Sequence, residues 1–305
     1  MRHADAVVRA IEKLQLWHER RWVKARDVAT PDPLPHVPLH GLVVTWHEAD
    51  IVGISVRNAF EQGCDVVHLL DNGSPDDTVA VAKAAGAIFE GEFVTDTFDL
   101  RVGQARVTEL VERVSQASGL DRLWWLYFDA DELVEGPDGS TVRDLIDRLD
   151  RSHRVVGSRT MNHYPRRDHP LEEGQDPRFV PTNVQERHGI HCRRDHWKHP
   201  LVRWDAQGPR LVASTGYHIV HADRRLVEPL PAVMSHHYPY RAQSATVRRL
   251  ERLRPRLKGH GWAVSRREAN ADAIYREAYD EVDSYDMVGP KQVFGPEPCP
   301  PVRSE

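Results

Sequence analysis

The chain has 305 residues, of which 40% are hydrophobic and 29% charged, and its formal net charge is −5. This composition supports one large folded domain or two small ones, excludes general disorder and argues against a broad nucleic-acid-binding surface. The three cysteines, Cys64, Cys192 and Cys299, are far apart and odd in number, so they indicate no disulfide framework. No apolar run reaches membrane-spanning length, so we expect a soluble, cytoplasmic protein without integral membrane association or a nucleic-acid partner.

Helical spacing of apolar residues predicts an amphipathic helix over 5–27, followed by a proline-rich linker at 31–35. Strands and helices then alternate: strands at 41–46, 65–70, 87–89 and 124–128, and helices at 49–62, 76–86 and 103–118. This alternation predicts an α/β fold, with a mostly parallel sheet flanked by helices. Ligands of such sheets bind beyond the carboxyl ends of the strands.

The second half of the chain is richer in Arg, His, Pro and Asp, and its predicted elements are shorter. Strand candidates lie at 154–158, 200–204 and 216–221, helix candidates lie at 242–253 and 265–279, and an irregular tail follows. We therefore divide the chain into a helix and linker, a first half of the main domain, a second half carrying ligand-contacting loops, and a C-terminal helical extension. The boundaries of these four segments are 1–37, 38–150, 151–241 and 242–305.

The strand at 124–128 ends in three carboxylates, Asp129, Asp131 and Glu132. Side chains alternate along a strand, so Asp129 and Asp131 are expected on the same side. Mg²⁺ and Mn²⁺ prefer oxygen ligands and commonly bind through one or two carboxylates, while substrate phosphates complete the shell. The pattern therefore favours a metal site with a phosphorylated substrate, the alternative being a solvated turn.

Two further polar segments follow predicted strands, at residues 45–50 (TWHEAD) and 71–78 (DNGSPDDT), the latter an Asx- and Gly-rich turn into a helix. With the DADE segment at 129–132, these motifs resemble, in order, those of family 2 glycosyltransferases of the GT-A fold, over roughly residues 39–150. The resemblance implies a GT-A-type, Rossmann-like sheet, a nucleotide-sugar donor, a Mn²⁺ or Mg²⁺ cofactor and inversion at the anomeric carbon.

The resemblance places Thr45 and Glu48 beside the nucleoside and gives Asp71 a hydrogen bond from an imide N–H of the base. Cytosine has no N–H at that ring nitrogen and would leave a buried carboxylate unpaired, which is costly. UDP-sugar is therefore the leading donor, with thymine and guanine nucleotides still open. The chain departs from the commonest family pattern at Asn72, where a second Asp is frequent, and at Pro75, where Thr is frequent.

For the metal, the resemblance implies direct binding by Asp131, with Asp129 as a second ligand or as a contact to ribose or metal-bound water. Glu132 would lie nearby, unless it caps a helix or faces solvent. The segment 236–241 (HHYPYR) resembles a late element of some of these enzymes, in which a histidine approaches the metal, and we favour His237 over a packing role. Arg106 is expected either at the diphosphate or in a surface ion pair.

The catalytic base of such an enzyme follows the metal strand, in the acceptor-binding half. The candidates here are Glu186, Asp195 and His196, of which we favour Asp195. His196, Trp197 and Lys198 are expected to form a sugar-binding surface, because aromatic faces stack on sugar C–H groups; a core tryptophan beside solvated charges is the alternative. The sequence thus predicts a metal-dependent glycosyltransferase with an unidentified acceptor.

Three other functions remain open. The His- and Cys-rich segment 188–199 has ligands for a Zn²⁺ site, and hence for a zinc-dependent hydrolase or a structural zinc module, although its spacing matches no zinc signature. A sugar-phosphate nucleotidyltransferase would carry a Gly-rich, basic loop after the first strand, where residues 45–50 contain neither glycine nor a lysine or arginine. A non-catalytic binding module would keep the fold and lose the chemistry.

Overall fold

The structure, a computed structural model, describes residues 36–95, 100–149, 153–166, 168–186, 198–208, 212–213, 220–221 and 227–253. The chain divides into two units, Met1–Val37 and Pro38–Glu305, and nearly all of the described residues belong to the second. The helices predicted at 5–27 and 265–279 lie outside the described residues. No helix within those ranges is long and apolar enough to cross a membrane.

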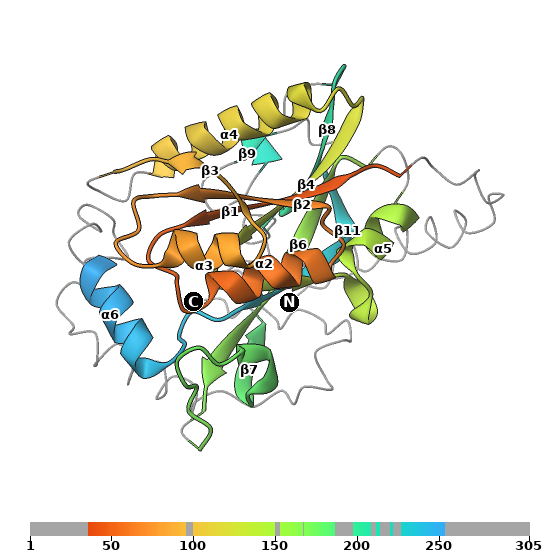
Figure 1. The fold of residues 1–305 in the computed structure, drawn as a ribbon. Coiled ribbons are helices and arrows are strands. Elements are labelled where there is room, and N and C mark those ends of the chain that lie inside the picture. Colours follow the sequence, from red (N-terminus) through yellow and green to blue (C-terminus); the bar gives the residue numbers. More distant parts are fainter. Residues whose placement is uncertain are drawn as a thin grey trace, which may run out of the picture. The chain divides into compact units, whose positions relative to one another are not determined.

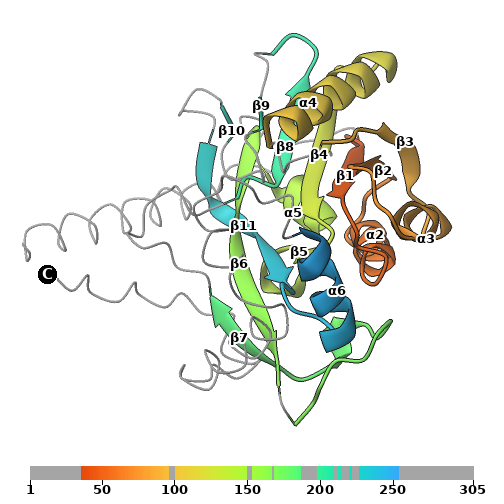
Figure 2. The ribbon, with the colours of Figure 1, turned by 90° about the vertical axis from the view of Figure 1, so that its left-hand side faces the viewer.

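The first half of the domain contains four adjacent parallel strands in the order β3-β2-β1-β4. These are β1 (Leu39–Thr45), β2 (Val66–Asp71), β3 (Ile88–Glu92) and β4 (Arg122–Asp129). The connecting helices are α2 (Val52–Glu61), α3 (Thr78–Ala84) and α4 (Leu100–Ala117). Helices α2 and α3 cover one face of these strands and α4 covers the other (Figures 1 and 2). This half has the alternating arrangement that its sequence predicts.

The second half turns the sheet from parallel to mixed. Its strands are β5 (Glu132–Glu135), β6 (Val155–Pro165), β7 (Thr182–Glu186), β8 (Leu201–Asp205) and β11 (Val227–His237), with the short pair β9 (Val212–Ala213) and β10 (Val220–His221). Strand β8 runs antiparallel to both β4 and β6, and β5 runs antiparallel to β11, whereas β11 is parallel to β6. The fold is therefore α/β with a mixed sheet, and the expected predominance of parallel pairing holds for the first half only.

The remaining described elements are α5 (Val142–Arg148), α6 (Gln243–Leu253) and two 3₁₀ turns, Pro137–Gly139 and Pro177–Phe179. Helix α5 begins with a capping box, in which the Thr141 side chain accepts from the Asp144 N–H while the Asp144 carboxylate accepts from the Thr141 N–H. Helix α6 follows β11 directly and lies near the carboxyl ends of β1 and β4 (Figure 2).

The core centres on β4, whose residues Leu123 to Phe128 are all buried. A fully buried large apolar side chain stabilises the fold by roughly 1.5–3 kcal/mol relative to leaving it exposed. The indole N–H of Trp125 donates to the hydroxyl of Ser115 over 2.9 Å, which ties α4 to the sheet. This continuous apolar strand gives the carboxylates at its end a rigid base.

Two contacts hold the turn after β4. The buried Asn58 side chain of α2 donates to the Val134 carbonyl (3.1 Å) and accepts from the Val134 N–H (2.7 Å), which fixes β5. The backbone N–H of Tyr238 donates to the Asp131 carbonyl over 2.8 Å, which brings the end of β11 against the same turn. The turn is therefore fixed by segments from both halves of the domain.

A separate row of side chains, which we call the histidine chain, joins β7, β6, β11 and β5. Thr182 Oγ1 lies 2.8 Å from His163 Nδ1, His163 Nε2 lies 2.9 Å from His236 Nδ1, and His236 Nε2 lies 3.2 Å from Glu135 Oε1. The His163 ring also stacks on Tyr238 with a centroid separation of 4.5 Å. Alternation along β11 directs His236 to the sheet face opposite His237.

Candidate functional site at the carboxyl edge of the parallel strands

The register of the parallel strands brings the three sequence motifs to one edge of the sheet. Thr45 at the end of β1 pairs with Asp71 at the end of β2, and Val44 pairs with Asp129 at the end of β4. The motifs, separated by many residues in the chain, therefore begin side by side. Such an edge is where open α/β sheets bind ligands.

Asp71 is buried and accepts three hydrogen bonds. Its Oδ1 accepts from the hydroxyls of Thr45 (2.8 Å) and Ser74 (2.6 Å), and its Oδ2 accepts from the Ser74 N–H (2.6 Å). Gly73 makes this tight turn possible, because its φ of +70° lies in the left-handed region. An ionised carboxylate offers roughly four lone-pair positions, so Asp71 retains capacity for one more donor.

The loop after β1 is locked to the turn after β2. The His47 N–H donates to Ser74 Oγ over 2.9 Å, and His47 Nδ1 lies 2.7 Å from an Asp76 carboxylate oxygen. The Glu48 N–H donates to Thr78 Oγ1 over 2.9 Å. His47 has a φ of +59°, an uncommon value for a residue with a side chain, which these contacts hold in place.

Two arginines link the β1 loop to the carboxylates after β4. Arg241, which is buried, lies 2.7 Å from Glu48 Oε2 and 2.7 Å from Asp50 Oδ2, and its Nη1 lies 3.6 Å from Asp131 Oδ2. Arg249 of α6 lies 2.9 Å from Glu48 Oε1 and 3.7 Å from Asp131 Oδ2. Burial raises the pKa of Glu48 to about 7, against the opposing effect of the two guanidinium groups.

Asp131 and His237 form a pair suited to a divalent cation. His237 Nε2 lies 3.7 Å from Asp131 Oδ2, while His237 Nδ1 lies 2.8 Å from the Asn162 side-chain oxygen. That oxygen can only accept, so a neutral imidazole carries its proton on Nδ1 and leaves the Nε2 lone pair toward Asp131. Burial would raise the pKa of Asp131, but His237 when it is protonated, together with Arg249 and Arg241, outweighs burial and holds that pKa well below its usual range.

This oxygen and imidazole nitrogen fit Mn²⁺ or Mg²⁺ when the ligand supplies the other donor atoms. Within the described ranges there is no group of three or more His, Cys, Asp or Glu side chains arranged to hold a metal. Asp131 and His237 alone would leave most of the coordination shell of such a cation to water or to phosphate oxygens.

Lys198 occupies the other side of the turn. Its Nζ lies 2.6 Å from Asp129 Oδ2 and 2.5 Å from Glu132 Oε1, and its side chain is 7% exposed. Burial would lower the pKa of Lys198, but the two carboxylates outweigh it and raise the pKa above its usual range. Burial also raises the pKa of Glu132, with Lys198 opposing it. Lys198 is thus an interior cation, and its predicted place on a sugar-binding surface is wrong.

We refer to these eight side chains together as the strand-edge cluster: Glu48, Asp50, Asp129, Asp131, Glu132, Lys198, Arg241 and Arg249. Five of them are carboxylates and three are cationic, so with every carboxylate ionised the cluster has two negative charges in excess. One divalent cation balances that excess.

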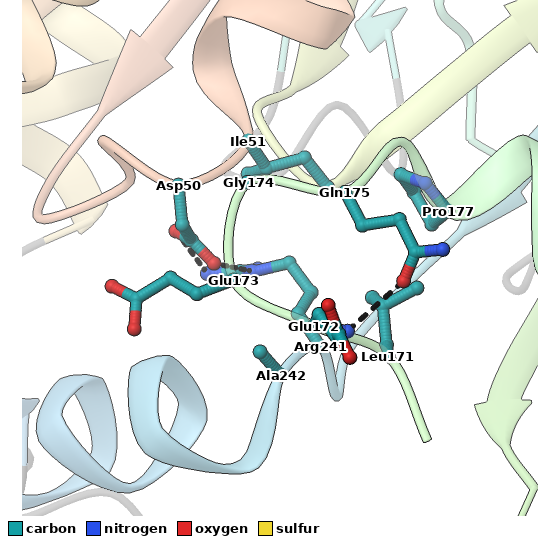
Figure 3. Close-up of a pocket in the computed structure, with 10 residues that line it drawn as sticks. All are labelled: Asp50, Ile51, Leu171, Glu172, Glu173, Gly174, Gln175, Pro177, Arg241 and Ala242. Carbon is teal, nitrogen blue, oxygen red and sulfur yellow. Dashed lines mark hydrogen bonds and ion pairs between the residues drawn. The ribbon is translucent and has the colours of Figure 1, made fainter. Parts of the chain in front are cut away.

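A small cleft adjoins the cluster (Figure 3). It is lined by Asp50, Ile51, residues 171–175, Pro177, Arg241 and Ala242. The Arg241 side chain pairs with Asp50 along one wall, and the loop of residues 171–175 forms the other (Figure 3). Glu173 of this loop accepts from Ser244 Oγ over 2.9 Å and from Arg248, so the loop is fastened to α6.

The other predicted site residues fall in different places. Arg106 is 54% exposed and pairs with Glu109 over 3.1 Å, which is the surface ion pair given as one of its two predicted roles. Glu186 lies on β7, but its side chain is outside the described part of the chain, as are Asp195 and His196. Of the segment 188–199 only Lys198 and His199 are described. The roles predicted for these residues stay predictions.

Sequence reasoning missed the parts played by Lys198, Arg241 and Arg249. Arg241 belongs to the HHYPYR segment, which drew attention for its histidines, and Arg249 lies on the helix predicted at 242–253. Nothing in the local sequence of Lys198 marks it as buried, because its partners lie 69 and 66 residues away.

No protein-family model and no curated protein matches this chain. Solved structures similar to it include a mycobacterial protein at 18% identity, with 43% of this chain and 42% of that one covered and a TM-score of 0.27. Another is glucosyl-3-phosphoglycerate synthase from Mycobacterium tuberculosis in complex with Mn²⁺, UDP-glucose and phosphoglyceric acid, at 18% identity, 41% and 44% coverage and a TM-score of 0.25. A third is TarS from S. aureus, at 10% identity, 81% and 43% coverage and a TM-score of 0.35.

The chain spans less than half the length of these proteins, between 42% and 44% of each. Similarity at this level carries no argument about activity, so any function has to be argued from the residues of the strand-edge cluster and its surroundings.

Proposed function

We propose that this protein is a metal-dependent glycosyltransferase, which moves a sugar from a nucleoside-diphosphate sugar to an acceptor, with inversion. The observation that carries the proposal is the convergence of three polar motifs at the carboxyl edge of adjacent parallel strands, in the register Thr45 to Asp71 and Val44 to Asp129. The family resemblance of those motifs assigns the first two to the nucleoside and the third to the metal and diphosphate.

Asp131 and His237 would hold Mn²⁺ or Mg²⁺, which supplies the charge that stabilises a departing diphosphate. With every carboxylate of the strand-edge cluster ionised, a divalent cation would balance the excess of two negative charges, and this supports the assignment. Arg249 of α6 is 22% exposed and lies 3.7 Å from Asp131 Oδ2, which supports a contact between its guanidinium and the same diphosphate. The acceptor base remains among Glu186, Asp195 and His196.

The donor is proposed to be a UDP-sugar, since Asp71 has room for one more donor at its carboxylate and an imide N–H of uracil would fill it. The acceptor is proposed to enter from the side of the cleft in Figure 3, beside Asp50 and Arg241. Phe179 follows Pro177, a residue that lines the cleft, by two positions in the chain, and it is 80% exposed. Its ring offers a face on which a sugar can stack.

The first experiment is a thermal-shift panel of UDP, TDP, GDP and CDP, each with and without Mn²⁺, because a ligand that binds only the folded state raises its stability. We expect a Mn²⁺-dependent shift with UDP or TDP. In Asp131→Asn the metal-dependent part of the shift should disappear, with metal affinity reduced on the order of 100-fold. Asp168→Asn, a change at a 57% exposed carboxylate paired with Arg166, is the matched control and should behave like the wild type.

A shift of equal size in wild type and Asp131→Asn would refute the metal assignment. A shift with Zn²⁺ alone and none with any nucleotide would instead support a zinc site in residues 188–199. Turnover of a UDP-sugar, measured as UDP release with and without chelator, then separates an enzyme from a binding module.

Asp71→Asn tests the base pocket. The amide nitrogen cannot accept from the Ser74 N–H, and an amide oxygen is a weaker acceptor than a carboxylate, so we expect UDP affinity to fall by about tenfold. Calorimetric titration with UDP and Mn²⁺ measures this, with unfolding by urea as a control for intact structure. Equal UDP affinity in the two proteins would show that the base binds elsewhere.

A further inference from the structure

Lys198 has no role in the function proposed above, yet its ammonium group contacts two carboxylates of the strand-edge cluster. An ammonium group has three donors and no acceptor, and it acts as a compact point charge. Two of its contacts go to carboxylates of the same turn, Asp129 at 2.6 Å and Glu132 at 2.5 Å. Because the side chain is 7% exposed, water is largely excluded from this charge.

The backbone around Lys198 is fixed from two sides. The Ser158 N–H on β6 donates to the Lys198 carbonyl over 2.8 Å, and the Tyr127 N–H on β4 donates to the Pro200 carbonyl over 2.7 Å. The ammonium therefore extends from an anchored stretch between two strands of the sheet and is held where the carboxylates of the turn converge.

A divalent cation and this ammonium group compete for the same oxygens. A cation bound by Asp129 and Glu132 would have to displace Lys198 or lie against its like charge without intervening water, which is unfavourable. Asp131 Oδ2 and His237 Nε2 lie outside this competition, since the contacts described for Lys198 go to Asp129 and Glu132. Lys198 thus contacts one half of the turn directly, whereas the cationic groups nearest to Asp131 Oδ2, those of Arg241 and Arg249, lie 3.6 and 3.7 Å away.

We propose that Lys198 is a built-in cation that holds Asp129 and Glu132 in place and confines an incoming divalent metal ion to Asp131 and His237. Lys198 is a positioning residue in this scheme. With so few protein ligands, the metal must take most of its coordination from water or from the donor diphosphate. The free protein then binds Mn²⁺ weakly, and a nucleoside diphosphate strengthens the binding.

The same arrangement gives Asp129 a role other than metal ligand. Lys198 holds one of its oxygens, while the side chain as a whole is 40% exposed. A carboxylate fixed at one oxygen presents the other as a preoriented acceptor for a ligand hydroxyl, such as that of a ribose. This part of the inference rests on the proposed function, whereas the division of the turn between two cations does not.

The deciding experiment uses Mn²⁺ alone, titrated against the protein while electron paramagnetic resonance reports the free ion. Lys198→Met removes the built-in cation and leaves three carboxylates at the turn, so we expect Mn²⁺ to bind about tenfold more tightly than to wild type. Lys198→Arg keeps the positive charge and should stay within about threefold of wild type. Lys198→Met binding Mn²⁺ no more tightly than wild type overturns the proposal.

The double variant Lys198→Met/Asp129→Asn is the matched control, because it removes one positive and one negative charge together. Its Mn²⁺ affinity should return toward that of wild type, and a gain equal to that of Lys198→Met counts against the proposal. If Lys198→Met is unfolded without metal, the same gain appears as stabilisation by added Mn²⁺. A Mn²⁺-induced rise in melting temperature no larger than in wild type is then the overturning result.

The failure of this inference is distinguishable from failure of the proposed function. Repeating the titrations with UDP tests the function, because UDP should increase Mn²⁺ affinity in wild type. No effect of UDP together with a gain in Lys198→Met rejects the glycosyltransferase and retains the role of Lys198. An effect of UDP without a gain of Mn²⁺ affinity in Lys198→Met retains the glycosyltransferase and rejects the role of Lys198.

Discussion

The strand-edge cluster and the histidine chain are both arrays of titratable side chains within the same sheet, and they differ in charge balance. The cluster sets five carboxylates against three cations, all within 4 Å of an opposite charge. The histidine chain has a single carboxylate, Glu135, at an end that is 28% exposed. The cluster is therefore held by ion pairs between charges of both signs, whereas the histidine chain has one carboxylate at its partly exposed end.

The hydrogen bonds of the histidine chain run in one direction. An ionised Glu135 can only accept, so His236 donates from Nε2 and accepts at Nδ1 from His163 Nε2. His163 Nδ1 then accepts from the Thr182 hydroxyl. With both rings neutral, every ring nitrogen in this row has its partner, which is the pattern of a structural network. The two arrays therefore differ in what holds them: ion pairs in the strand-edge cluster and hydrogen bonds between rings in the histidine chain.

The largest effect expected within this comparison comes from Arg241→Met. The change leaves Glu48 and Asp50 without their shared guanidinium in a buried setting, and breaking a buried ion pair in this way costs about 3–5 kcal/mol. Urea unfolding measures the loss. Arg248→Met is the matched control on the neighbouring helix, because its pair with Glu173 is about half exposed on both sides, and an exposed pair contributes about 0–1 kcal/mol.

Equal losses in the free energy of unfolding of Arg241→Met and Arg248→Met would contradict the distinction between ion pairs of the buried cluster and ion pairs at the surface. A loss of stability in Arg241→Met that Mn²⁺ partly reverses would sharpen it, because a cation from solution would then replace one from the protein.

Part of the strand edge that carries the cluster could be predicted from the sequence. The ends of β1, β2 and β4 were predictable because apolar runs that stop at polar residues are local signals, and parallel neighbours then bring their ends together. Thr45, Asp71 and Asp129 follow from that rule, and the structure places them at adjacent strand ends. The predicted first strand at 41–46 differs from the observed Leu39–Thr45 by two residues at one end and one at the other.

The second half was less predictable because its contacts are distant in sequence. Arg241 meets Glu48 across 193 residues, and no periodic pattern records such a pairing. Strand β11 was missed for a local reason as well: its Pro229 and Pro231 argue against a strand, since proline cannot donate to a neighbouring strand. The structure accommodates them with a register shift between Glu228 and Val233, where the pairing with β6 is irregular.

The smaller effect expected within the comparison is a pH dependence set by neutral buried histidines. Burial, followed by the proximity of His236 and His237, lowers the pKa of His163 from 6.5 to about 3. Burial and the neighbouring His68 lower the pKa of His40 to about 4, against an opposing effect of Asp65. As the pH falls below 6.5, these imidazoles bind protons in the unfolded chain before they do so in the folded protein.

Stability therefore falls as the pH drops from about 6.5 toward 4, by about 1.4 kcal/mol per pH unit for each histidine that stays neutral only in the folded state. His163→Phe keeps a ring against Tyr238 and removes one titrating group, so its stability should be lower at pH 7 and decline less steeply below it. His169→Phe, at a histidine that is 49% exposed, is the control for loss of a surface imidazole.

Urea unfolding at pH 7, 6, 5 and 4.5 gives the slope of unfolding free energy against pH for each protein. A slope in His163→Phe equal to that of wild type would mean that His163 ionises as readily in the folded protein as in the unfolded chain. The histidine chain would then contain a cation paired with Glu135, as the strand-edge cluster contains cations paired with carboxylates, and the distinction between neutral rings and ion pairs would be lost.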